Sequence, residues 1–301
     1  MFKGVEQGAG LLLHSFQLLR KHPSLIVPLV VVWLFFAVLL AVLVLDGRVP
    51  DKLDDAGIGI LLAYGIGGFC LFVMAQTLAA AVVVGVLRES ALETDPADAQ
   101  SVSLQWHRVV PVLGKQLPRL IVLALVWSML WLLIIVATSS GSDRREQSEY
   151  MRRMRRWLNR AVRLGVFLIM PALLWDHKGL IQAAGEAKRI VRSRLAEFAT
   201  IFLGSGLFSG IAAIPVIGVA YAMDQGYLGE TVAMVAILVW LALTTGVQLY
   251  IEQIACAGLY GWHRNWVEKR EQAFAKGLPE PSPESIPMPR YLQEGGWQED
   301  R

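Results

Sequence analysis

Residues 25–45 read LIVPLVVVWLFFAVLLAVLVL, which is a stretch of 21 residues without a charged side chain. A helix rises 1.5 Å per residue and needs about 20 apolar residues to cross the hydrocarbon core of a bilayer. Arg20 and Lys21 precede the stretch, and Asp46 follows it. We therefore expect a retained membrane-spanning helix, because the apolar core of a cleaved signal peptide would lie nearer to the N-terminus.

The composition of the whole chain agrees with a membrane protein. Hydrophobic residues make up 55% of the chain and charged residues only 18%, and the mean hydropathy is +0.48. A soluble domain carries charges on about a quarter of its residues. The net charge of +3, with no continuous basic stripe, argues against nucleic-acid binding. Cys70 and Cys256 lie in apolar runs and predict neither a disulfide framework nor a metal knuckle.

Five further apolar runs follow the first one. They cover residues 56–87, 120–138, 157–175, 198–223 and 231–251. The run at 157–175 reaches crossing length only if the side chains of Arg160 and Arg163 extend to the membrane interface. The sequence therefore predicts an all-α polytopic bundle of six transmembrane helices.

An amphipathic stretch precedes each pair of spans. Apolar residues step by three and four along residues 5–19, 106–120 and 180–198, the last with apolar positions at Leu180, Ala184, Ala187, Val191, Leu195 and Phe198. This pattern predicts three units, each made of a surface helix and a helical hairpin.

The distribution of Lys and Arg predicts the orientation. With six spans and a cytoplasmic N-terminus, the inner segments hold 18 of these residues and the outer segments hold 10. The loop 139–163 opposes this bias, because it carries eight arginines on the outer side. Either it forms an outer-surface helix with Met151, Met154, Leu158 and Ala161 facing lipid, or the fourth segment does not cross. We favour the first alternative and place both termini in the cytoplasm, in a bacterial inner membrane.

Basic residues of the surface stretches are the candidates for binding anionic lipid headgroups. The bilayer is thus the first expected partner. The candidates are Arg20, Lys21, Arg152, Arg153, Arg155, Arg156, Arg189 and Arg192.

The composition changes after Trp266 to charged residues and then to prolines. We expect an N-terminal surface helix at 1–24, a membrane domain at 25–266 and a flexible cytoplasmic tail at 267–301. Prolines remove amide donors and prevent a continuous helix in the tail. Trp297 is the large apolar residue near its end and the one we expect a protein partner to bind.

The stretch Phe167-Leu-Ile-Met-Pro-Ala-Leu-Leu-Trp175, followed by Asp176-His-Lys-Gly-Leu-Ile-Gln-Ala-Ala184, resembles a bacterial family of six-span membrane proteins of unknown function. Residues 15–28 and 257–260 fit the same pattern. The arrangement is similar, more loosely, to membrane domains attached to bacterial glycerophosphodiester phosphodiesterases, but this chain has no catalytic domain. The resemblance implies a helical membrane fold and supplies no catalytic residues.

Polar residues inside apolar runs are the candidates for a membrane-embedded function, because they are costly in hydrocarbon. They are Gln76, Gln248, Glu252 and Gln253. Glu252 lies near the inner end of the last span, where a solvated or helix-pairing role is the alternative to a pathway.

The sequence predicts no catalytic, cofactor-binding or metal-binding residue. The five histidines lack metal-ligand spacing, and Ser205 in Gly204-Ser-Gly206 has no histidine partner at mid-membrane depth. We expect a non-enzymatic component that organises or assists a membrane complex. The alternatives are a small transporter or channel and, third, an intramembrane enzyme.

Overall fold

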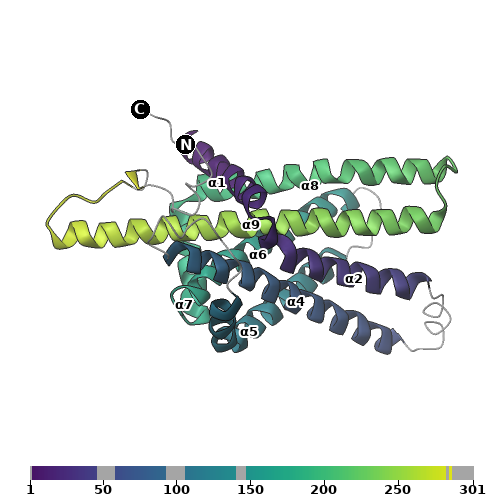
Figure 1. Ribbon diagram of the computed structural model, residues 1–301, viewed down its shortest axis with the longest axis horizontal. Coiled ribbons are helices and arrows are strands. Elements are labelled where there is room, and N and C mark those ends of the chain that lie inside the picture. The colour runs from purple at the N-terminus through teal and green to yellow at the C-terminus, as the bar shows by residue number, and fades with distance from the viewer. Residues whose placement is uncertain (1, 46–57, 93–105, 140–146, 283–284, 287–301) are drawn as a thin grey trace.

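The computed structural model describes residues 2–45, 58–92, 106–139, 147–282 and 285–286 (Figure 1). All regular secondary structure in these ranges is helical, which confirms the all-α prediction. The elements are α1 (Phe2–Lys21), a short 3-10 helix η1 (Pro23–Ile26), α2 (Val27–Leu45), α4 (Ile58–Leu92), α5 (Trp106–Ser139), α6 (Gln147–Leu174), α7 (Leu180–Ser193), α8 (Leu195–Asp224) and α9 (Glu230–Ala275).

Several of these helices are suited to a bilayer. Among the described residues, α4, α5, α6, α8 and α9 each contain a stretch long and apolar enough to cross one. The pair formed by 3–21 and 23–39 passes the same test only together, across a bend of 105°. The bend falls at Pro23, whose ring removes an amide donor, and His22 before it leaves the helical conformation. The described chain thus has five apolar helices of spanning length, or six with the bent pair.

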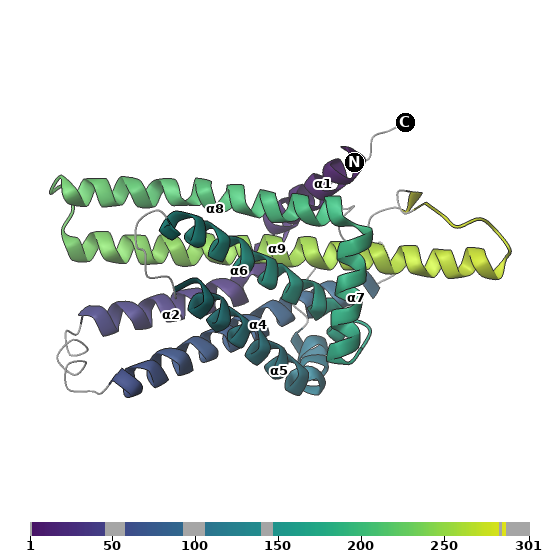
Figure 2. The same ribbon diagram turned by 180° about the vertical axis from the view of Figure 1, so that it is seen from behind.

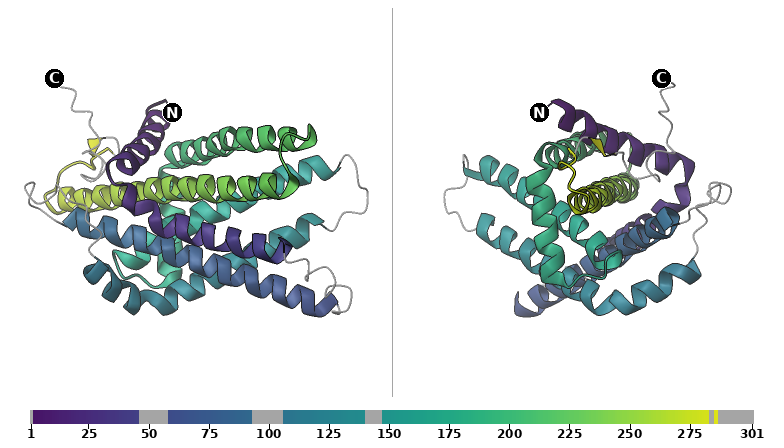
Figure 3. Two further views of the ribbon diagram at one scale, coloured as in Figure 1. Left: turned by 45° about the vertical axis from the view of Figure 1, so that its right-hand side comes forward. Right: turned by 90° about the vertical axis from the view of Figure 1, so that its left-hand side faces the viewer.

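Helix α9 forms the axis of the bundle (Figures 1 and 3). It contacts α1, α2, α4, α6 and α8, and every residue from 248 to 263 is buried. This stretch is rich in small residues, including Ala255, Ala257 and Gly258, which allow neighbouring helices to approach closely. The stretch 248–263 therefore lies in the interior, whereas most residues of α9 before and after it are partly or fully exposed.

Helix α7 lies across the end of the bundle (Figure 2). It separates from α8 at Arg194, as the predicted surface helix requires. Its buried face consists of Ala183, Ala187 and Ile190, whereas the exposed side chain of Ala184 had been predicted on the apolar stripe. The stripe is rotated by about one residue, because the helix packs on α6 and α9.

Two predicted surface stretches are continuous with spans. Residues 106–120 form the first part of α5, which accommodates Pro111 and Pro118 in its interior. The arginine-rich stretch from 147 onward is the first half of α6. The arginines of α6 therefore enter the bundle on the same helix as the fourth apolar run.

The segment after α9 returns to the helix. The described part differs from the predicted flexible tail at 267–301, since α9 itself continues to Ala275. The indole of Trp262 donates to the Ile286 carbonyl at 2.8 Å, and that of Trp266 donates to the Pro281 carbonyl at 3.0 Å. These backbone acceptors could not be read from composition. Trp297 lies outside the described residues.

Glycines set the contact between α1 and α8. A methyl group on Gly8 would lie 2.7 Å from the Cβ of Thr200 and 2.9 Å from the Glu197 carbonyl oxygen. We expect Gly8→Ala to destabilise the protein by about 1–3 kcal/mol, because backbone must move to admit the methyl group. Thermal unfolding in detergent measures the effect.

The matched control for this substitution is Gly165→Ala in α6. A methyl group there meets no atom within 4 Å. Alanine should leave stability unchanged or raise it by about 0.5–1 kcal/mol through its better helix propensity. Equal melting temperatures for the two variants would mean that α1 does not pack on α8 in this way.

Candidate functional site

A cavity of about 420 Å³ lies among six helices of the bundle. Its volume falls within the range of about 300–1,000 Å³ typical of small-molecule sites. Its walls come from α2, α4, α5, α6, α8 and α9. The lining residues are Trp33, Phe69, Phe72, Val73, Gln76, Trp127, Trp131, Arg156, Asn159, Arg160, Arg163, Ser209, Thr245 and Gln248.

Helix α6 supplies the cationic wall of this cavity. Arg156, Arg160 and Arg163 are spaced by four and three residues, which places them on one face of a helix, and Asn159 lies beside them. Leu158 and Ala161 occupy the opposite side and are exposed. Of the four residues predicted to face outward, these two are exposed, whereas Met151 and Met154 are half-buried.

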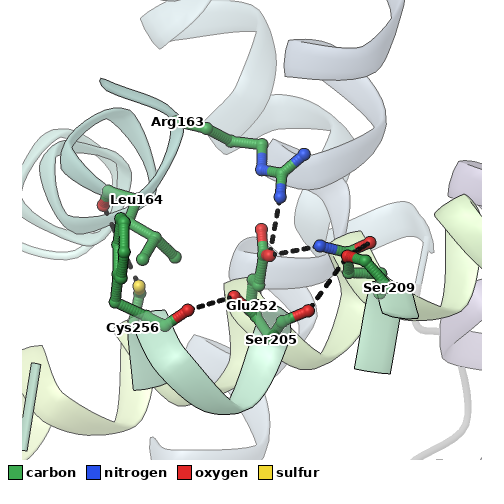
Figure 4. Close-up of polar contacts among 8 residues, drawn as sticks. Arg163, Leu164, Ser205, Ser209, Glu252 and Cys256 are labelled. Carbon is green, nitrogen blue, oxygen red and sulfur yellow. Dashed lines mark hydrogen bonds and ion pairs between the residues drawn. The ribbon is translucent and has the colours of Figure 1, made fainter. Parts of the chain in front are cut away.

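Glu252 of α9 links the cationic wall to a chain of polar side chains (Figure 4). Its Oε1 accepts from Arg163 at 2.7 Å and from the Gln248 amide at 2.8 Å. The carbonyl oxygen of Gln248 in turn accepts from the Ser209 hydroxyl at 2.8 Å. Glu252 is completely buried, and the Arg163 side chain is 20% exposed. The arrangement holds Arg163 at the edge of the cavity.

The prediction that Arg160 and Arg163 extend to the membrane interface differs from this geometry. Arg163 turns inward to Glu252, and the guanidinium of Arg160 lies over the Phe202 ring at 5.5 Å. A buried carboxylate and an aromatic face stabilise these charges inside the bundle. The spacing of the arginines in the sequence predicts that they share one face of a helix. It does not show which other helices that face packs against.

Aromatic side chains of α2, α4 and α5 also line the cavity. Trp33 of α2 meets Phe72 of α4 edge to face at a centroid distance of 4.8 Å. Phe69 of α4 stacks on Trp131 of α5 at 4.5 Å. Both geometries are favourable for aromatic pairs, so the rings support one another. The cavity lining therefore combines guanidinium groups with aromatic surface.

Several polar atoms around the cavity are buried and lack a hydrogen-bond partner among the described residues. The donors are Trp33 Nε1, Arg160 Nε and Arg163 Nε. The acceptors are Asn159 Oδ1 and, next to the cavity, Glu252 Oε2. Buried polar groups are normally paired, and an unpaired one costs about 1–3 kcal/mol. Their position around one hollow leaves both donors and acceptors free to bind a polar ligand or water there.

The charges of the site do not cancel. Three guanidinium groups line the cavity, whereas Glu252 is the carboxylate beside it and pairs with Arg163. In the described part of the chain, no carboxylate forms an ion pair with Arg156 or Arg160. The excess of positive charge favours an anion.

Three of the four predicted polar candidates meet here. Gln76 and Gln248 line the cavity, and Glu252 lies directly behind Gln248. Gln253 points elsewhere, with its amide 3.5 Å from the Phe167 carbonyl. Glu252 is completely buried and pairs with Arg163 of α6, which agrees with the helix-pairing role and not with a solvated one.

The predicted headgroup-binding residues divide between two places. Arg20, Lys21, Arg189, Arg192 and Arg153 have exposed positions. Arg156 lines the cavity, and Arg155 approaches the Ile135 carbonyl of α5 at 3.5 Å. The side chain of Arg152 lies outside the described residues. Lipid binding by the exposed group stays a prediction.

Other parts of the described chain give weaker evidence for a functional site. The described residues contain no group of three or more His, Cys, Asp or Glu side chains placed to hold a metal ion. The hydroxyl of Ser205 donates to the Phe202 carbonyl at 3.0 Å, within its own helix. A hollow of about 540 Å³ at the end of α9 involves Phe274 and Leu278, both exposed at the surface. The two hollows are about equally open to the outside, and the one among six helices is the stronger candidate because charged, polar and aromatic side chains meet there.

The fold and the cavity together define a helical protein with several membrane-length apolar helices around an amphipathic interior site. No protein-family model, curated protein or solved structure matches the chain. The resemblance to a six-span bacterial family therefore stays a prediction, and the functional argument rests on the residues of the site.

Proposed function

We propose that the protein is an integral membrane protein of six spans that binds an organic anion inside its helix bundle and carries it across the bilayer. The six spans would form three units, with α1 and α7 as surface helices of the first and third. The five long apolar helices support this count, and the sixth span would be α2, which follows the 105° bend after α1. The bias of 18 to 10 in Lys and Arg supports a cytoplasmic location of both termini.

The depth of the cavity supports a carrier. Ser209 lies about 22 Å along α8 from the turn before α9, and Gln248 lies about 27 Å along α9 from that turn. Trp131 and Arg156 lie about 12–14 Å from the corresponding ends of α5 and α6. Trp131 and Arg156 would lie near the middle of a hydrocarbon core about 30 Å thick, where transporters place their substrate sites, whereas Ser209 and Gln248 would lie nearer its inner side.

The single observation that carries the proposal is the group of three arginines facing a cavity with one neighbouring carboxylate. Ionisable residues inside a membrane are costly and commonly mark substrate pathways. A scaffold for a membrane complex, our first hypothesis from the sequence, needs only close helix packing. It gives no role to a charged cavity, so the transporter alternative is now favoured.

Octyl phosphate and 1-octanol form a matched pair of probes, equal in chain and different in charge. We expect the protein in nanodiscs to bind octyl phosphate, and Arg160→Gln to weaken that binding at least about ten-fold, which corresponds to about 1.4 kcal/mol. Calorimetric titration, corrected with empty nanodiscs, measures both affinities. Equal binding of octanol, or an unchanged affinity in the variant, would argue against an anion site.

The control variant is Lys188→Gln on α7. It removes one positive charge from an exposed side chain that does not line the cavity. Its affinity should match that of the parent protein. Uptake of radiolabelled octyl phosphate into sealed proteoliposomes then tests carriage: saturable uptake that Arg160→Gln abolishes supports a transporter, and binding without uptake supports a receptor or scaffold.

A further inference from the structure

We infer that the ligand of this cavity is a single-chain amphipathic anion of medium length, with its phosphate or carboxylate group at Arg160 and Arg163 and its chain against the aromatic side chains. The inference rests on the proposed anion-binding function and adds the class of the ligand. It follows from the mixed charged and aromatic lining of the cavity, its size and the places of the unpartnered polar atoms.

The charged end of the ligand would bind to arginines of α6. Arg160 and Arg163 are one helical turn apart, and the Nε atom of each is buried without a partner. A guanidinium presents planar, paired donors that match the oxygen geometry of a phosphate or a carboxylate. One terminal nitrogen of Arg163 already donates to Glu252. The remaining N–H groups of Arg163 and those of Arg160 would donate to the anionic group of the ligand.

The apolar end of the ligand would contact aromatic side chains of α2, α4 and α5. Trp33, Phe72, Phe69 and Trp131 line the same cavity as the arginines and pair ring against ring. None of these rings is fully buried, so apolar surface is still available to a ligand. Removing a methylene group from water contributes about 0.8 kcal/mol. A hydrated inorganic anion would leave this surface unused.

The size of the cavity limits the chain. A volume of about 420 Å³ holds about a dozen groups the size of a water molecule, each of which occupies about 30 Å³. A phosphate with a chain of about eight carbons fills this space. Both chains of a phospholipid exceed this volume, so we take a single-chain anion as the ligand that the cavity itself holds.

Three probes test this inference in nanodiscs: octyl phosphate, inorganic phosphate and dioleoyl phosphatidate placed in the bilayer. We expect octyl phosphate to bind at least about 30-fold more tightly than inorganic phosphate, because several methylene groups leave water. Phosphatidate should not displace it. Equal affinities for octyl and inorganic phosphate, or displacement by phosphatidate, would overturn the inference.

Trp131→Ala separates the two ends of the site. This substitution should weaken the binding of octyl phosphate at least about five-fold, since Trp131 is one of the stacked aromatic rings of the cavity. The affinity for inorganic phosphate should stay unchanged. Trp131→Phe, which keeps a ring at this position, should restore most of the affinity and guards against a folding defect. An unchanged affinity for octyl phosphate in Trp131→Ala would overturn the placement of the chain.

The outcomes for the proposed function and for this inference differ. If octyl phosphate binds no better than octanol, the anion site itself fails and the inference fails with it. If octyl phosphate binds better than octanol but no better than inorganic phosphate, the anion site stands and the amphipathic ligand is wrong.

Discussion

Glu252→Ala is expected to destabilise the protein by about 3–5 kcal/mol, the cost of leaving one member of a buried ion pair without its partner. Glu252 is completely buried and accepts from both Arg163 and Gln248. Without it, no other carboxylate among the described residues pairs with the guanidinium of Arg163. The melting temperature in detergent, measured with a denaturant series, gives the size of the loss.

A double variant distinguishes the ion pair from simple loss of packing. Arg163→Met with Glu252→Leu removes both charges and keeps similar volumes, so it should recover much of the lost stability. Glu268→Ala, on the exposed end of the same helix, is the control and should change stability by less than about 0.5 kcal/mol. If the double variant is no more stable than Glu252→Ala, the two charges are not coupled.

Trp262→Ala is the second substitution with a large expected effect, about 3–5 kcal/mol. Trp262 is 1% exposed, and the guanidinium of Arg194 lies over its ring at 3.9 Å. Its indole also donates to the Ile286 carbonyl. The alanine variant leaves a cavity, uncovers Arg194 and removes an anchor of the returning segment. Thermal unfolding and protease sensitivity after α9 report these changes.

Trp262→Phe separates the ring from the donor. Phenylalanine keeps an aromatic face for Arg194 but leaves the Ile286 carbonyl unpaired, so we expect a smaller loss of about 1–3 kcal/mol. Protease cleavage after α9 should increase in both variants. If neither variant increases cleavage, the segment around Ile286 is not held by Trp262.

The class of fold was predictable because it depends on local composition. Runs such as 25–45 and 231–251 can be recognised from their length and lack of charge. The separate surface helix α7 was predictable from apolar spacing, although the exposed Ala184 shows that the rotation of the stripe was not. Which face is buried depends on the helices that pack against it, and a single sequence does not contain those neighbours.

The candidate site was only partly predictable. The cost of polar groups in hydrocarbon singled out Gln76, Gln248 and Glu252, which do lie at or beside the cavity. Arg160 and Arg163 were assigned to the membrane interface instead, because long cationic side chains ordinarily extend to it. Their inward direction depends on Glu252 and Phe202, which belong to distant parts of the chain. Only the three-dimensional packing of α6 on α8 and α9 could show this.

The central claim, an anion site inside the bundle, is tested most directly by a crystal structure with 8-bromooctyl phosphate. We predict phosphate oxygens within hydrogen-bonding distance of Arg160 and Arg163, and an anomalous bromine peak beside Phe69 and Trp131. A bromine peak found only on the outer surface of the helices, or an empty cavity at a saturating concentration of the probe, would contradict the account.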